Sequence, residues 1–305
     1  MVLDAAVKAG APEGIIGWID VPSLELTNEV MRDADLILAT GGPGMVKSAY
    51  SSGKPCYGVG SGNVQGIFDD DVDIPEAVTK VIASRTFDKG IICSGDQTII
   101  APASKYDEIM AEFVKQGCVY YDDKETVDKF REVIFPGGEM NKDLVGQSVA
   151  KVAEAAGVDV PAGTKVIILA PAEYGDKDCF SKEKMCPVMT AYKYNDWKEA
   201  VAIAKANLDY FGAGHSCSIQ SNNEEHIEYA GEVLPVSRVL INQSCASQNG
   251  GAFVNSLSPT TTLGCGSWGN NSISENLTYY HLFNKSRIAF VKPGATQPSD
   301  EEIWG

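Results

Sequence analysis

The chain has 305 residues, 44% of them hydrophobic and 22% charged, a composition typical of a globular protein that buries a core of its own. Its 41 acidic residues outnumber 25 basic ones, and the formal net charge of -16 disfavours nucleic acid as a partner. No apolar run reaches membrane-spanning length and no signal peptide pattern opens the chain, so we expect no membrane. Eight cysteines without a CxxC pair, beside only three histidines, argue against a bound metal and predict free thiols in the cytoplasm.

The first 85 residues alternate between strand and helix patterns, which predicts parallel βαβ units. We expect strands over GIIGWIDV, ADLILAT (34–40) and PCYGVGSGN (55–63), and helices from Ser23 to Arg32 and from Ile74 onward. A domain boundary is expected near Arg85. About three strands are fewer than the roughly five or six of an open α/β sheet, so we expect further strands upstream of residue 1.

A second α/β series follows the boundary. Strands are expected over residues 91–102, 165–172, 187–194, 217–221 and 238–243, and helices over 105–117, 125–134, 145–156, 196–208 and through His226. The segment RIAFVKP (287–293) reads as a last strand, followed by a loosely held terminus.

The motif ATGGPGMVKSAY places Gly41, Gly42 and Gly44 between a strand and a helix. Glycine permits close backbone approach, and a helix N-terminus offers free N–H groups to a phosphate. The motif is not the GxGxxG fingerprint, and a tight turn that simply needs glycine explains it equally well. Lys47, one turn further on, is either a phosphate contact or a solvated residue.

Three side chains are candidates for chemistry. GIICSGDQT puts Cys93 between an apolar strand and a turn of small polar residues, which leaves the thiol room for a substrate. A small buried hydrophobe is the competing interpretation of each cysteine, and spacing alone does not select among the eight. His215 in GAGHSCSIQ is either a base or a loop anchor, whereas His226 and His281 are expected at the surface. Glu183 in SKEKMCPV either holds ribose hydroxyls or lies in a solvated turn.

The segment TTTLGCGSWGNNSISEN (260–276) is too rich in glycine and serine to be core, and its Trp268 favours an ordered, functional loop. Together with ATGGPGMVKSAYSSGKP, GVGSGN, FDKGIICSGDQ, KEKMCPV and GHSCSIQSNN, it resembles the CoA-acylating branch of the aldehyde dehydrogenase superfamily. The motifs occur in the family's order and span nearly the whole chain. Within that branch, the chain resembles the enzymes that act on acetaldehyde, succinate semialdehyde, sulfoacetaldehyde and propionaldehyde.

The resemblance implies that Cys93 attacks the aldehyde, that hydride passes to NAD or NADP, and that CoA releases the acyl group as acyl-CoA. It also implies that His215 belongs to the acylating machinery. Hydrolytic members have a glutamate base at the position that matches Gly58, so its absence favours transfer to a thiol over hydrolysis.

The same resemblance implies cofactor-binding roles for Gly41, Gly42 and Gly44 in the turn and for Glu183 at the nicotinamide ribose. It does not specify which aldehyde is used, nor NAD against NADP.

The implied fold is α/β and aldehyde dehydrogenase-like. Residues 1–85 would be the C-terminal part of a Rossmann-type NAD(P)-binding domain, 86–285 a complete catalytic domain, and 286–305 an oligomerisation strand and tail. We therefore expect a homo-oligomer whose small-molecule partners are an aldehyde and CoA. The family's chain begins well upstream, so the sequence resembles an N-terminally truncated member without the asparagine of the oxyanion hole. A hydrolytic aldehyde dehydrogenase and a truncated, catalytically silent subunit remain the alternatives.

Overall fold

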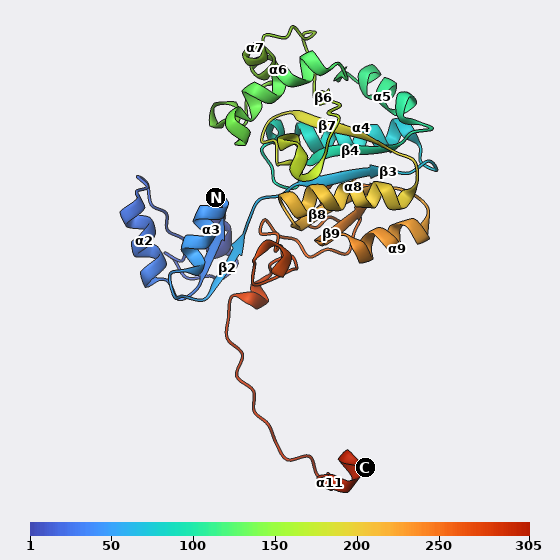
Figure 1. The fold of residues 1–305 in the computed structure, drawn as a ribbon. Helices are drawn as coiled ribbons and strands as arrows, with labels where there is room; N and C mark the ends of the chain where they lie inside the picture. The colour runs from blue at the N-terminus through green and yellow to red at the C-terminus, as the bar shows by residue number, and fades with distance from the viewer.

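The computed structural model describes residues 1–305 and contains two parallel β-sheets, one of two strands and one of seven (Figure 1). The smaller sheet has the order β1-β2, and the larger has the order β5-β6-β7-β4-β3-β8-β9. Every strand pair is parallel, and α-helices connect most consecutive strands, as the alternating sequence pattern predicts. No helix combines the length and apolar character needed to cross a membrane.

The smaller unit is built around strands β1 and β2. Its elements are α1 (Val2–Lys8), α2 (Leu24–Asp33), β1 (Ile37–Thr40), α3 (Pro43–Tyr50) and β2 (Cys56–Val59). Its apolar core cluster consists of Met31, Ile37, Ala39, Ala49 and Cys56. The strand predicted over GIIGWIDV does not form: residues 15–19 have no regular structure and Trp18 is 83% exposed. No other strand lies beside this segment to complete its backbone hydrogen bonds.

The larger unit contains the other strands. They are β3 (Val64–Phe68), β4 (Asp96–Pro102), β5 (Val119–Tyr121), β6 (Ile167–Leu169), β7 (Val188–Tyr194), β8 (Gly214–Gln220) and β9 (Val236–Ile241). Its main helices are α4 (Ile74–Thr86), α5 (Tyr106–Lys115), α6 (Lys124–Ile134), α7 (Val149–Ala156), α8 (Trp197–Tyr210) and α9 (Glu224–Val233). Most of these elements confirm the predicted series, although the short strands β3 and β5 were not expected.

Helices cover both faces of the larger sheet. Along β4, Ile99 and Ala101 pack into the cluster that contains α4 and α5, whereas Ile100 packs with α8 and α9. Figure 1 shows the same arrangement, with α4 and α5 on one side of the sheet and α8 and α9 on the other. This alternation along one strand is what a three-layer α/β/α sandwich requires.

The division between the sheets lies earlier than the boundary expected near Arg85. Strand β3 pairs with both β4 and β8, and all five of its residues are buried. It therefore belongs to the larger sheet together with α4, and the two sheets divide between Val59 and Val64.

The C-terminal segment leaves the body of the molecule. Figure 1 shows it as a long extension that ends in α11 (Asp300–Trp304). The strand predicted over RIAFVKP does not form, because no strand of the same chain lies beside it. Its apolar residues Ile288, Phe290 and Val291 are 84%, 88% and 91% exposed.

Candidate active site

The predicted chemical residues gather at one edge of the larger sheet. Cys93 lies just before β4, Glu183 before β7, and His215 is the second residue of β8. Because the strands are parallel, their amino ends meet at the same edge. The parallel topology thus assembles the site from segments that are far apart in the sequence.

Cys93 does not follow an apolar strand, so that part of the prediction is wrong. Ile91 and Ile92 lie in a turn, and β4 begins only at Asp96. Before this turn, Asp88, Lys89 and Gly90 have φ angles of 46°, 53° and 76°. Three successive left-handed residues cannot belong to an extended strand, and they turn the chain from α4 into the Cys93 loop.

Cys93 and His215 are in direct contact. The imidazole Nε2 lies 3.2 Å from the Cys93 sulfur. Burial, followed by the negative charge of Glu183, raises the pKa of the Cys93 thiol to about 11. Burial, followed by the positive charge of Arg238, lowers the pKa of His215 to about 3. At neutral pH the pair is therefore a thiol and a neutral imidazole rather than a thiolate–imidazolium ion pair.

Two glycines allow the backbone segments of the site to approach one another. A Cβ atom at Gly62 would lie 1.9 Å from the carbonyl oxygen of Cys93. A Cβ at Gly214 would lie 2.0 Å from the carbonyl oxygen of Cys265, and its φ of +95° is rarely adopted by other residues. Any larger side chain at either position would displace the Cys93 loop or the 260–276 loop.

A polar network behind His215 was not predicted from the sequence. Its Nδ1 lies 3.0 Å from the hydroxyl of Ser216, which also receives hydrogen bonds from Asn249 Nδ2 at 2.6 Å and Arg238 Nε at 3.3 Å. The sequence contains one signal of this network. Within VSRVLI the buried positions alternate, and Arg238 occupies one of them, between Val236 and Leu240.

Glu183 is a buried carboxyl group with no basic side chain in an ion pair with it. Burial raises its pKa to about 7, while the charge of Arg85 and the N–H of Gly62 oppose that rise. The Arg85 guanidinium instead donates to the carbonyl oxygens of Lys184 and Cys186. The carboxyl of Glu183 thus retains capacity to accept hydrogen bonds from a ligand hydroxyl.

The glycine turn has the predicted strand–turn–helix form. Gly42 is the N-cap of α3, and no side chain caps this helix. Gly41, Gly42 and Gly44 lie outside the left-handed region, and a Cβ at Gly42 or Gly44 would meet no atom within 4 Å. The chain's own folding therefore does not demand glycine at these two positions, which favours close approach by a ligand. The hydrogen bonds of this turn do not reach Cys93, His215 or Glu183.

A cavity of about 730 Å³ lies between the smaller unit and the larger one. Lys47 and Tyr50 of α3 line one side, and Phe211, Cys265 and Trp268 line the other. The loop 260–276 thus contributes directly to the cavity. Gly60 and Ser61 also line it, directly before Gly62, whose backbone lies against Cys93; Cys93, His215 and Glu183 are not among the lining residues.

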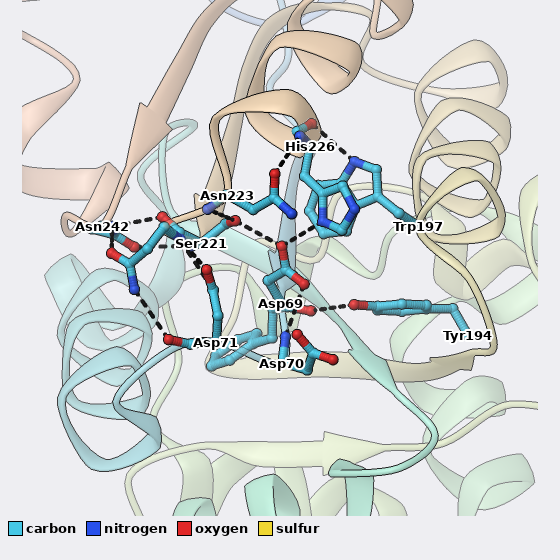
Figure 2. A network of polar contacts seen from close by, with 11 residues as sticks. Asp69, Asp70, Asp71, Tyr194, Trp197, Ser221, Asn223, His226 and Asn242 are labelled. Atoms are coloured by element: carbon cyan, nitrogen blue, oxygen red, sulfur yellow. Dashed lines mark hydrogen bonds and ion pairs between the residues drawn. The ribbon is translucent and has the colours of Figure 1, made fainter.

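His226 belongs to a different cluster, at the carboxyl edge of the sheet (Figure 2). Its Nδ1 lies 2.7 Å from Asp69 Oδ2, and its ring stacks on Trp197 at 4.6 Å between centroids. Ser221 donates to the same carboxylate oxygen at 2.7 Å. His226 and His281 are both half-buried rather than surface residues. The two ring nitrogens of His281 contact Thr278 N and Glu275 Oε1.

Comparison with known proteins decides the family. A model of the aldehyde dehydrogenase family matches residues 1–120. The chain is 54% identical to the succinate-semialdehyde dehydrogenase (acetylating) of Clostridium kluyveri, over 98% of its own length and 66% of that protein. The chain belongs to the aldehyde dehydrogenase family.

Other members of the aldehyde dehydrogenase family are also similar to this chain over most of its length. A sulfoacetaldehyde dehydrogenase of an Acholeplasma species is 40% identical, with 98% of this chain and 62% of that protein covered. The solved structure of an acetylating aldehyde dehydrogenase from Geobacillus thermoglucosidasius matches with a TM-score of 0.91 at 38% identity. That match covers 97% of this chain and 66% of the other, which establishes the aldehyde dehydrogenase-like α/β fold. The chain spans just under two thirds of the length of these relatives.

Proposed function

We propose that this protein is a CoA-acylating aldehyde dehydrogenase with Cys93 as its nucleophile. The observation that carries the proposal is the contact between Cys93 and His215, with a sulfur–nitrogen distance of 3.2 Å, at an edge bordered by a large cavity. The relatives named above, whose names describe acetylating or sulfoacetaldehyde dehydrogenases, support a short-chain aldehyde as substrate.

In this proposal the Cys93 sulfur bonds to the aldehyde carbon, and the thiol proton ends on the aldehyde oxygen. NAD or NADP, when bound, would accept the hydride; the hydroxyl proton of the thiohemiacetal would leave to solvent, and a thioester on Cys93 would remain. The thiol of CoA then bonds to the acyl carbon, the Cys93–carbon bond breaks, and Cys93 regains a proton as acyl-CoA departs.

The chain's own groups fit such a cofactor. The uncapped amino end of α3 and Lys47 offer hydrogen-bond donors and positive charge beside the cavity, which suits phosphate groups. Gly41, Gly42 and Gly44 would allow close approach there, and Glu183 would accept hydrogen bonds from ribose hydroxyls. Titration of the wild-type protein with NAD and with NADP shows which dinucleotide binds with the higher affinity. The same titrations of Lys47→Ala show how much this lysine contributes to that affinity.

The second half-reaction separates acyl transfer from hydrolysis. With saturating aldehyde and dinucleotide but no CoA, we expect at most one equivalent of reduced cofactor per active site, followed by steady turnover when CoA is added. Absorbance of the reduced nicotinamide measures both phases, across acetaldehyde, succinate semialdehyde and sulfoacetaldehyde. Sustained formation of free acid without CoA would contradict the proposal and support the hydrolytic alternative.

A glutamate at position 58 should not restore hydrolysis. A Cβ at Gly58 would lie 2.7 Å from the Tyr50 ring and 2.8 Å from Val46. The Gly58→Glu variant should therefore have a lower melting temperature and still require CoA.

We also propose that the protein forms a homo-oligomer through residues 287–293. The exposed apolar side chains of this segment favour pairing with a second chain, and strand β9 presents an unpaired edge of the larger sheet. Removal of residues 284–305 should lower the mass measured by light scattering to that of a monomer. An unchanged oligomer would place the interface elsewhere.

The eight unpaired cysteines of the chain support a cytoplasmic location.

A further inference from the structure

Arg238 is a buried cation without an anionic partner. Its side chain is 4% exposed, and it takes part in no ion pair. Its guanidinium donates to the carbonyl oxygens of His215 at 2.9 Å and Gly264 at 2.7 Å, and to neutral side chains of Ser216 and Asn276. Burying a charge without a counter-ion is costly, so a purely structural role would be filled better by a neutral residue.

The hydrogen bonds of Ser216 determine the state of the histidine. Its oxygen accepts from Asn249 Nδ2 and from Arg238 Nε, and neither of these nitrogens accepts hydrogen bonds. The hydroxyl proton of Ser216 is therefore available for His215 Nδ1, 3.0 Å away. A neutral imidazole carries one proton, so that proton must be on Nε2, the nitrogen in contact with the Cys93 sulfur.

We propose that Arg238 and Ser216 are positioning residues that hold His215 as a neutral ring whose Nε2–H donates to the Cys93 sulfur. This inference rests on the proposed function, because it assigns His215 a step in acyl transfer. The ring does not take the thiol proton, which ends on the aldehyde oxygen when the thiohemiacetal forms. Instead it stabilises the sulfur as a thiolate when Cys93 attacks, and again when CoA displaces it from the acyl group.

The positive charge of Arg238 favours the same two states, a neutral His215 ring and a Cys93 thiolate. It disfavours a second proton on His215 and opposes the rise in the pKa of the Cys93 thiol. The unpaired cation thus finds its counter-ion in the Cys93 thiolate only during the reaction.

The tautomer is directly measurable in protein labelled with ¹⁵N-histidine. Nitrogen chemical shifts separate a protonated from an unprotonated imidazole nitrogen, and His215→Gln assigns the signal. We expect Nε2–H in the wild type, a mixture of tautomers in Ser216→Ala, and the wild-type state in Ser216→Thr, which restores the hydroxyl. A proton on Nδ1 in the wild type, or an unchanged tautomer in Ser216→Ala, would overturn the inference.

The reactivity of Cys93 provides a second readout. Its alkylation by iodoacetamide, followed by peptide mapping, should accelerate about tenfold per pH unit up to the pKa of about 11. Loss of the cation in Arg238→Met should slow this alkylation roughly tenfold at pH 8, and Arg238→Lys should recover part of the rate. Ser221→Ala is the matched control, since this buried serine follows the carboxyl end of β8. It belongs to the Asp69–His226 network (Figure 2).

These measurements are independent of catalysis. An unchanged alkylation rate in a folded Arg238→Met protein would overturn the role of its charge. If Arg238→Met does not fold, Ser216→Ala still tests the network with the charge in place. Absence of acyl-CoA formation by a wild-type protein that shows the expected tautomer and rates would contradict the proposed function alone.

Discussion

Replacement of Cys93 by alanine should reduce acyl-CoA formation by roughly four orders of magnitude or more, because it removes the thiol in contact with His215 Nε2. The residue is half-buried and the substitution removes a single atom, so we expect little change in melting temperature. Coupled absorbance assays of the wild type and variant measure the loss. Cys179→Ala is the matched control, because this thiol is also half-buried but belongs to the apolar cluster around α6 and α7.

The covalent step is testable without a dinucleotide. Incubation with acetyl-CoA should transfer one acetyl group to the wild-type chain, detected by intact mass and mapped to Cys93. Cys93→Ala should remain unmodified. A silent subunit would show no acylation at all, and acylation of another cysteine would overturn the assignment of the nucleophile.

Gly62→Ala should produce the second large effect. Its Cβ would lie 1.9 Å from the Cys93 carbonyl oxygen, so the Cys93 loop has to move. Displacement of a reacting group by about 1 Å can cost roughly 100-fold in rate, and we expect kcat to fall by at least that factor with a smaller change in KM. The melting temperature should also fall, since backbone atoms rather than a flexible side chain are in the way.

Gly60→Ala provides the control for this prediction. It lies in the same GVGSGN segment, but its Cβ would meet no atom within 4 Å. We expect near-normal stability and alkylation of Cys93 in this variant. Equal losses of kcat and melting temperature in Gly60→Ala and Gly62→Ala would show that the segment needs glycine for flexibility rather than for close approach to Cys93.

The sequence predicts the alternation of strands and helices well, because apolar runs and helical periodicity are local properties. It fails for β3, the five-residue strand that separates β4 from β8 in the larger sheet. A short apolar run directly after GVGSGN reads as the end of the preceding strand. Only pairing with β4 and β8, both distant in sequence, reveals it as a separate strand.

The candidate site was predictable to the extent that its motifs are contiguous. Cys93, His215 and Glu183 each lie in a recognisable segment, whereas Arg238 is visible only as a charge at a buried position of a strand. The general tendency of ligands to bind at the carboxyl ends of parallel strands would have pointed to the opposite edge. Here that edge is occupied by the Asp69–His226 network of Figure 2, and the candidate residues Cys93, Glu183 and His215 lie at the amino ends.

The neutral state of Cys93 has a consequence for the lifetime of the protein. Peroxides and similar oxidants attack thiolates far faster than thiols, and over-oxidised cysteine is not recovered by simple reduction. With its pKa raised to about 11, the resting sulfur is almost entirely protonated at physiological pH. In the proposed mechanism, the arrangement that delays ionisation until an aldehyde is present would therefore also protect the nucleophile from oxidative damage between turnovers.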